Sequence, residues 1–210
     1  MTPRLLAIPP PDGPVPADIL GPWLAAGARG LLAVLLRDPG RSPADILADH
    51  ARLAPLRRAC VAHAIPVLLA ADTADLDLPA DLAGLHLRGD PDLATLKRAR
   101  ARLGDRLLGR ACHGEPQPGH DLVDYTLLAP IFAPRTASPH PKHPAGLAAL
   151  ARWTADPRAH VIALGGITPA TAHACLAAGA RGLAGISGLF GDPAQVEQDV
   201  AAFVRLLEPR

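Results

Sequence analysis

The sequence predicts a single (β/α)₈ barrel (TIM barrel) that spans residues 1–210 as one domain and has some degenerate βα units. Short apolar runs alternate with longer amphipathic segments along the whole chain. The 24 Pro and 19 Gly residues are spread between these segments, as in many short βα connections. One eight-residue motif also occurs near both ends of the chain. A doubly wound α/β sheet is the alternative architecture.

Eight short runs predict the strands. Each run is almost continuously apolar, as expected for parallel strands that are buried on both faces. The predicted strands are Arg4–Ile8, Gly30–Leu36, Pro66–Ala70, Ala83–Leu87, Leu107–Cys112, Tyr125–Pro130, His160–Leu164 and Gly182–Ser187.

Six longer segments between the strands predict helices. The links between the third and fourth strands, and between the fifth and sixth, are too short for full helices, so we expect those units to be degenerate. The predicted helices are Ala17–Ala26, Pro43–Ala64, Leu93–Leu103, Gly146–Trp153, Pro169–Ala178 and Pro193–Leu207.

The repeated motif has the sequence LAAGARGL and covers Leu24–Leu31 and Leu176–Leu183. In each copy a glycine, Gly27 or Gly179, fits the left-handed conformation that commonly follows a helix. The same joint near both ends of the chain favours a closed ring of equivalent units. A helix stop that an alanine-rich chain happens to use twice is the competing explanation.

Composition excludes several classes of function. The net charge is +1 and aromatic residues make up 3% of the chain, so nothing favours a nucleic-acid partner. No apolar run reaches about 18 residues, which excludes a membrane span, and we interpret the chain as cytoplasmic. Cys60, Cys112 and Cys175 lack the spacing of metal ligands and indicate buried reduced thiols. A homo-oligomer is compatible with the sequence, which does not fix the number of subunits.

Two strand ends near the C-terminus predict a phosphate site. Gly165 and Gly166 follow the seventh strand, Thr168 fits a helix N-cap, and Pro169 fits the first helical position. The loops after strands seven and eight commonly bind phosphate in this barrel, although a tight turn alone also explains the two glycines. We expect the phosphate ligands to be Gly165, Gly166, Ile186, Ser187 and Gly188.

Segments in order along most of the chain together resemble one known family, most specifically in the C-terminal third. They are 36–38 (LRD), 84–87 (GLHL), 109–113 (GRACH), 124–132 (DYTLLAPIF), 136–140 (TASPH), 163–169 (ALGGITP) and 178–187 (AGARGLAGIS). In these segments the chain resembles thiamine-phosphate synthases and their TenI-like relatives.

The resemblance implies a TIM barrel and a role in thiamine biosynthesis. The synthases join hydroxymethylpyrimidine diphosphate to a thiazole phosphate and release diphosphate, so these small phosphorylated molecules are the expected ligands. The C–O bond breaks first, which requires stabilisation of the leaving diphosphate and implies Mg²⁺ held by carboxylates.

Site residues carried over from the family lie close behind the strands. Arg37 matches the family's diphosphate-binding arginine. Asp72 and Asp90 are the expected Mg²⁺ ligands, with Asp92 as the alternative to Asp90. The remaining expected catalytic residues are His113, just past the fifth strand, and Arg135, for which Lys142 is the alternative.

The chain also departs from the family's diphosphate site. Leu35, Pro39, Ala71 and Ala111 stand where the family carries Gln, Lys, Asn and Ser. Three activities therefore compete: a synthase with an altered diphosphate site, a TenI-like isomerase of a thiazole phosphate carboxylate, and a non-catalytic binding protein. In the isomerase, His113 or His140 would move the proton. We expect His86, on an apolar strand, to be a core residue bonded to the backbone.

Overall fold

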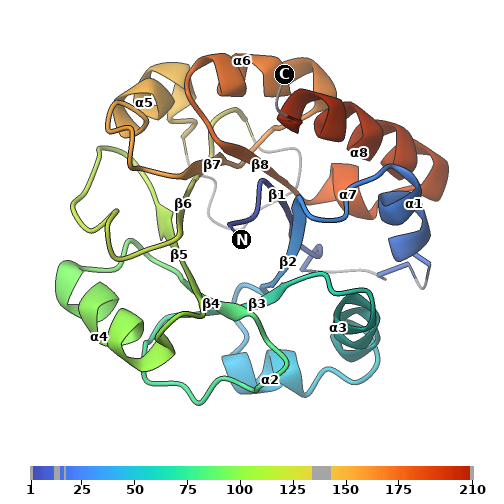
Figure 1. The fold of residues 1–210 in the computed structure, drawn as a ribbon, viewed down its shortest axis with the longest axis horizontal. Coiled ribbons are helices and arrows are strands. Elements are labelled where there is room, and N and C mark those ends of the chain that lie inside the picture. Colours follow the sequence, from blue (N-terminus) through green and yellow to red (C-terminus); the bar gives the residue numbers. More distant parts are fainter. Residues whose placement is uncertain (1, 12–14, 17, 134–142, 209–210) are drawn as a thin grey trace.

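A computed structural model describes residues 2–11, 15–16, 18–133 and 143–208 of the chain. It confirms the predicted fold: eight parallel strands form a closed barrel in sequential order, with helices around it (Figure 1). β1 pairs with both β2 and β8, which closes the ring. The strands are β1 (Leu5–Ala7), β2 (Leu32–Leu36), β3 (Val67–Ala71), β4 (Gly84–Leu87), β5 (Leu107–Cys112), β6 (Tyr125–Leu128), β7 (Val161–Ala163) and β8 (Gly182–Gly185).

The strands are buried on both faces, which explains their continuous apolar runs. One set of alternate side chains fills the barrel, and the other set packs against the helices. Leu6 pairs in register with Ala33 of β2 and with Ala184 of β8, so small and large residues share one level of the interior. The buried residues of the inner cluster are Leu6, Ile8, Ala33, Leu35, Leu68, Ala70, Tyr125, Leu127, Ile162 and Ala184.

The helices follow the sequence prediction except at two places. The predicted helix over Pro43–Ala64 is wrong, because the segment forms two helices. The Asp49 side chain accepts the backbone N–H of Arg52 at 2.9 Å, in a local bond that competes with helix continuation. The helices are α1 (Leu20–Ala25), α2 (Pro43–Leu47), α3 (Leu53–Ala62), α4 (Leu93–Leu103), α5 (Gly146–Trp153), α6 (Pro169–Ala177), α7 (Ser187–Phe190) and α8 (Pro193–Leu207).

The short helix α7 is the second difference. The sequence predicted a strand through Ser187, but β8 ends at Gly185 and Ser187 begins α7. The indole N–H of Trp23 donates to the carbonyl of Leu189 at 3.0 Å, and its ring meets Phe190 edge-on at 5.2 Å. These contacts from α1 hold α7 against the barrel.

The links β3–β4 and β5–β6 lack helices, as predicted. Arg106 stabilises the first link by donating to the carbonyls of Leu78, Pro79 and Leu82 at 2.5–3.1 Å. A cavity of about 240 Å³ lies beside this link, lined by residues of the link and the end of α4, such as Leu76.

A buried arginine stabilises the second link. The guanidinium of Arg110 donates to the carbonyls of Gln117 and Pro118 at 3.0 and 2.6 Å, and to the Thr126 hydroxyl at 3.0 Å. The residue is fully buried, and its guanidinium carbon lies 5.4 Å from the centre of the Trp153 ring. Hydrogen bonds to backbone therefore satisfy a charge that has no water around it.

The two copies of the repeated motif form the same joint. Gly27 and Gly179 have φ of 76° and 94°, and each donates its N–H to a leucine carbonyl three residues earlier at 3.0 Å. This confirms the predicted left-handed ends of α1 and α6. Within the described residues, no helix has the length and apolar character needed to cross a membrane.

Candidate active site

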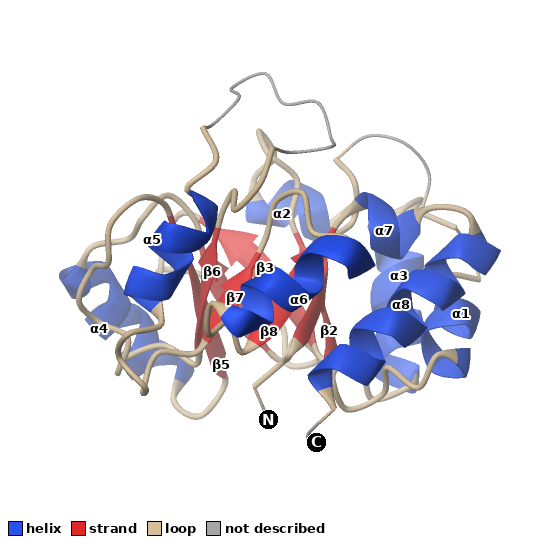
Figure 2. Cartoon of the chain, turned by 90° about the horizontal axis from the view of Figure 1, so that it is seen from above, coloured by secondary structure: helices blue, strands red, loops and turns tan. Residues whose placement is uncertain are grey.

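Four polar side chains follow inward-facing strand positions at one end of the barrel. Arg37, Asp72, Arg88 and His113 each lie two residues beyond a position that faces the barrel interior. Both chain termini lie at the opposite end (Figure 2). The carboxyl ends of the strands are where TIM-barrel enzymes place their active sites, so these residues define the candidate site.

Asp72 is bound by an arginine. Arg88 donates from Nε to Oδ1 of Asp72 at 2.9 Å and from Nη2 to Oδ2 at 2.5 Å. The Arg88 side chain is 15% exposed, whereas Asp72 is 72% exposed. Nη1 of Arg88 also reaches the carbonyl of Asp38 at 3.3 Å. The two-point geometry fixes the guanidinium plane at the barrel mouth.

Asp90 is engaged by a histidine. Its Oδ1 accepts the backbone N–H of His113 at 2.6 Å, and its Oδ2 lies 2.7 Å from Nδ1 of the same residue. Asp90 has φ of 55°, a left-handed conformation that is uncommon for a residue other than glycine. The contact joins the loop after β4 to the end of β5 and orients the imidazole.

Arg37 lies half-buried beside Arg88. Burial, and next the positive charge of Arg88, hold the pKa of Arg37 below its usual value. The carboxylate of neighbouring Asp38 is directed elsewhere, to Arg52 at 2.9 Å and Arg41 at 3.4 Å. Among the described residues, no side chain or carbonyl accepts a hydrogen bond from the Arg37 guanidinium.

The expected Mg²⁺ ligands do not fit that ion. The Asp72 carboxylate is already paired with the Arg88 guanidinium, and both oxygens of Asp90 contact His113. A Mg²⁺ ion at Asp72 would therefore lie beside a cation and would share each carboxylate oxygen with an N–H donor. Asp92, the alternative, caps α4 by accepting the N–H of Thr95 at 2.7 Å. The part of the chain that the structure describes contains no group of three or more His, Cys, Asp or Glu residues suited to a metal.

The glycines after β7 pack tightly against the loop after β6. Gly165 and Gly166 have φ of 100° and 64°. A Cβ on Gly165 would lie 2.5 Å from Cβ of Pro130, and one on Gly166 would lie 2.7 Å from the carbonyl oxygen of Ala133. The glycines are thus required by packing, independently of any ligand. Thr168 is the N-cap of α6, with Pro169 in its first turn, as predicted.

The segment after β8 is more open. Ile186 precedes α7, and Ser187 and Gly188 form its first turn, where backbone N–H groups have no partner within the helix. Ser187 is exposed and Gly188 is half-buried. A Cβ on Gly188 would meet only Oδ2 of Asp199, at an ordinary 3.5 Å. This turn lies at the end of β8, beside the glycines that follow β7.

The remaining predicted residues have mixed outcomes. Arg135, Lys142 and His140 lie outside the described residues. His86 is a core residue as expected, but its partner is the Tyr125 hydroxyl, 3.1 Å from Nδ1, and not the backbone. Burial, and next the charges of the two arginines, lower the pKa of His86 to about 3. Arg88 was missed, although its place two residues after an inward-facing histidine was a usable signal.

Comparisons with known proteins show which family the chain resembles. Residues 14–189 match the family model of thiamine monophosphate synthase. The thiamine-phosphate synthase of Bordetella avium is 34% identical over 80% of this chain and 79% of that protein. The thiamine-phosphate synthase of Chloroflexus aurantiacus is 31% identical over 87% of this chain and 81% of that protein.

A solved structure extends the match to the fold. The thiamine phosphate pyrophosphorylase of Pyrococcus furiosus superposes with a TM-score of 0.69 at 17% identity, over 97% of this chain and 95% of that one. Sequence and fold thus agree along most of the barrel, and the chain belongs to the thiamine monophosphate synthase family.

Proposed function

We propose that this chain binds thiazole phosphate at the carboxyl ends of β7 and β8, and acts in thiamine biosynthesis as a synthase-type barrel with a diverged diphosphate half. One observation carries the proposal: the two halves of the barrel mouth differ. The β7–β8 half keeps its glycines and the open first turn of α7, whereas in the β3–β4 half an arginine pairs with both oxygens of the expected metal ligand Asp72.

The phosphate site would use backbone donors. In many TIM barrels phosphate binds between the loops after strands seven and eight and the N-terminus of a short extra helix, and α7 is such a helix. Gly165 and Gly166 follow β7 beside this turn, and in this proposal their backbone N–H groups would donate to the phosphate, with Ile186 leading into α7. The Ser187 hydroxyl and the N–H of Gly188 would donate to its oxygens.

The coupling step would depend on stabilising the departing diphosphate. When the pyrimidine C–O bond breaks, negative charge grows on the leaving group, and the thiazole nitrogen then captures the cation. Arg37 and Arg88 can donate to that charge. Leu35, Pro39, Ala71 and Ala111 donate nothing from their side chains, so we expect coupling to be slow.

A second activity is favoured by the contact between His113 and Asp90. An imidazole held by a carboxylate at the barrel mouth can take a proton from one position of a bound thiazole and return it at another. Isomerisation of a thiazole phosphate carboxylate needs such a group and no leaving diphosphate. It would use the same phosphate site.

The proposal also covers the cellular compartment and the oligomeric state of the chain. Cys60, Cys112 and Cys175 are free and buried, and burial raises the pKa of Cys60 and of Cys112 to about 12. Such inert thiols support a reducing compartment, the cytoplasm. Light scattering of the purified chain would determine whether it forms a homo-oligomer.

Calorimetry with thiazole phosphate tests the proposal, in parallel with assays of coupling and of isomerisation. Saturable binding with one site per chain, together with slow coupling, is the expected result. Absence of thiazole phosphate binding would overturn the proposed function. Faster isomerisation than coupling would favour the second activity.

A further inference from the structure

We infer that Arg37 and Arg88 together form a metal-independent binding site for a diphosphate group, in which Arg88 stands in place of the expected cation. The inference rests on the proposed function, which supplies diphosphate as the ligand. It concerns the β2–β4 side of the barrel mouth, away from the glycines after β7.

The geometry brings the two guanidinium groups together across β3. Arg37 directly follows β2, and Arg88 directly follows β4. The backbone N–H of Arg88 donates to the carbonyl of Ala71 at 2.9 Å, and this bond fixes the position of Arg88 beside the carboxyl end of β3. Its side chain then spans β3 and reaches the carbonyl of Asp38, the residue next to Arg37.

The surroundings neutralise this pair of cations only in part. Within the described residues, Asp72 pairs with Arg88 but is mostly exposed, and the Asp38 carboxylate acts on Arg37 through its charge while it bonds to Arg52 and Arg41. Beneath the pair, His86 is buried within the barrel and bonded to Tyr125, and an imidazole can supply no negative charge. Two like charges that are partly removed from water repel one another, and an anion between them would relieve that repulsion.

Arg88 also explains the misfit of Mg²⁺. A divalent cation and a guanidinium serve the same purpose for a phosphate, since both neutralise charge, and a guanidinium can donate two parallel hydrogen bonds. Asp72 orients Arg88 through its two-point contact and is a positioning residue. In this inference the Arg88 guanidinium therefore supplies the positive charge that the family resemblance assigns to a bound Mg²⁺ ion.

The test uses inorganic diphosphate as the probe in titration calorimetry, with excess chelator and separately with Mg²⁺. The full chain should bind diphosphate in chelator. Arg37→Gln and Arg88→Gln should each weaken binding by about ten- to a hundredfold, the range for a hydrogen bond to a charged group. Asp72→Asn should still bind in chelator, because the Asn side chain keeps an oxygen that can accept from Arg88 and so position it, while the substitution removes a negative charge that would repel diphosphate. Arg88→Lys, which keeps the charge, serves if Arg88→Gln fails to fold.

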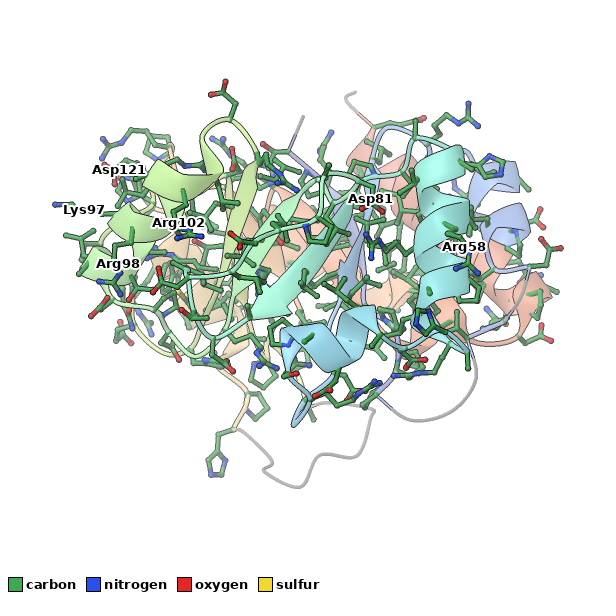
Figure 3. The ribbon with its side chains drawn as sticks, turned by 90° about the horizontal axis from the view of Figure 1, so that it is seen from below. Arg58, Asp81, Lys97, Arg98, Arg102 and Asp121 are labelled. Atoms are coloured by element: carbon green, nitrogen blue, oxygen red, sulfur yellow. The ribbon has the colours of Figure 1, made fainter. Side chains whose placement is uncertain are left out.

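The matched control is Arg57→Gln. Arg57 of α3 forms a similar two-point ion pair with Asp81, which lies beside α3 (Figure 3). The Arg57→Gln variant should bind diphosphate with the same affinity as the unmodified chain. Diphosphate binding that is absent or requires Mg²⁺, that survives both arginine substitutions, or that disappears in Asp72→Asn would overturn the inference. Thiazole phosphate titrated into the same variants reports separately on the proposed function, because its site lies at β7 and β8.

Discussion

Nδ1 of His113 lies 2.7 Å from one carboxylate oxygen of Asp90, and the backbone N–H of His113 donates to the other at 2.6 Å. An ionised carboxylate can only accept, so the neutral imidazole carries its proton on Nδ1 and its lone pair on Nε2. This is the tautomer that a proton-transfer histidine at the barrel mouth requires.

Replacing Asp90 with Asn should weaken the preference of His113 for the Nδ1–H tautomer. Asn tolerates the left-handed backbone of Asp90, so the loop should keep its shape. Nitrogen NMR of the imidazole should show mainly the Nδ1–H form in the unmodified chain and a mixture of tautomers in Asp90→Asn. If His113 moves a proton, His113→Gln should lower isomerisation by about 10²–10⁴-fold. An unchanged tautomer in Asp90→Asn would contradict the role assigned to this contact.

The phosphate site is best tested at Gly188. Gly188→Asp would meet little steric resistance and would place a negative charge in the first turn of α7. Thiazole phosphate binding should fall by at least about tenfold, because two like charges then compete for the same donors. Ala101→Asp, an exposed site on α4, adds the same charge elsewhere and should leave the affinity unchanged. Equal affinities in the two variants would exclude this turn as the site.

Gly166 is a poorer place for that test. A bulky residue at this expected phosphate ligand would block binding, but it would not spare the fold. In the structure even a Cβ would lie 2.7 Å from both the Ala133 carbonyl oxygen and Cβ of Phe132, in a left-handed backbone. Any loss of binding in Gly166→Ala would therefore be accompanied by distortion of the loop after β6.

Stability should depend on pH through His86. Its pKa is about 3 in the folded chain, compared with about 6.5 when unfolded, because burial and next the two arginines disfavour the charged form. Between these values the unfolded chain binds a proton that the folded chain does not. Folding therefore loses up to about 1.4 kcal/mol per pH unit as pH falls below about 6.5.

Urea denaturation from pH 7 to pH 4 measures this effect. His86→Gln keeps a partner for the Tyr125 hydroxyl and cannot titrate, so its stability should fall less steeply over that range. Parallel curves for the two proteins would show that His86 does not govern the acid sensitivity.

Arg110 should be essential for stability. Arg110→Met leaves the carbonyls of Gln117 and Pro118 without their donor in a buried link, and should cost about 3 kcal/mol or more in the free energy of unfolding. Arg98→Met, on the outer side of α4 (Figure 3), should change stability by less than about 0.5 kcal/mol. Similar losses of unfolding free energy in both variants would contradict the proposal that Arg110 stabilises the β5–β6 link.

Local patterns predicted most of the fold. The limits of β5, α4, α5 and α8 match the prediction, since their apolar periodicity and caps lie close in sequence. The break between α2 and α3 was missed because it depends on which backbone group the Asp49 side chain finds. α7 was missed because an apolar run cannot show where a strand becomes a four-residue helix.

The candidate site was predicted less completely. The family resemblance selected Arg37, and position just after a strand favoured Asp72 and His113 for the barrel mouth. Their partners could not be predicted in this way, since the contact of Asp72 with Arg88 joins residues 16 positions apart that follow neighbouring strands. The sequence could show that family donors are missing, but not that an arginine pairs with both oxygens of the expected metal ligand.

The most direct test of the central claim is steady-state coupling by the purified chain. Both synthase substrates are supplied, with Mg²⁺ and separately with excess chelator. Two lost donors of about 1.5–3 kcal/mol each should slow the step at least about a hundredfold relative to ordinary enzyme rates of about 1–10³ s⁻¹. We expect such a weak rate, unchanged by chelator, in a protein that still binds thiazole phosphate. An ordinary rate, or one that collapses when Mg²⁺ is removed, would contradict the account.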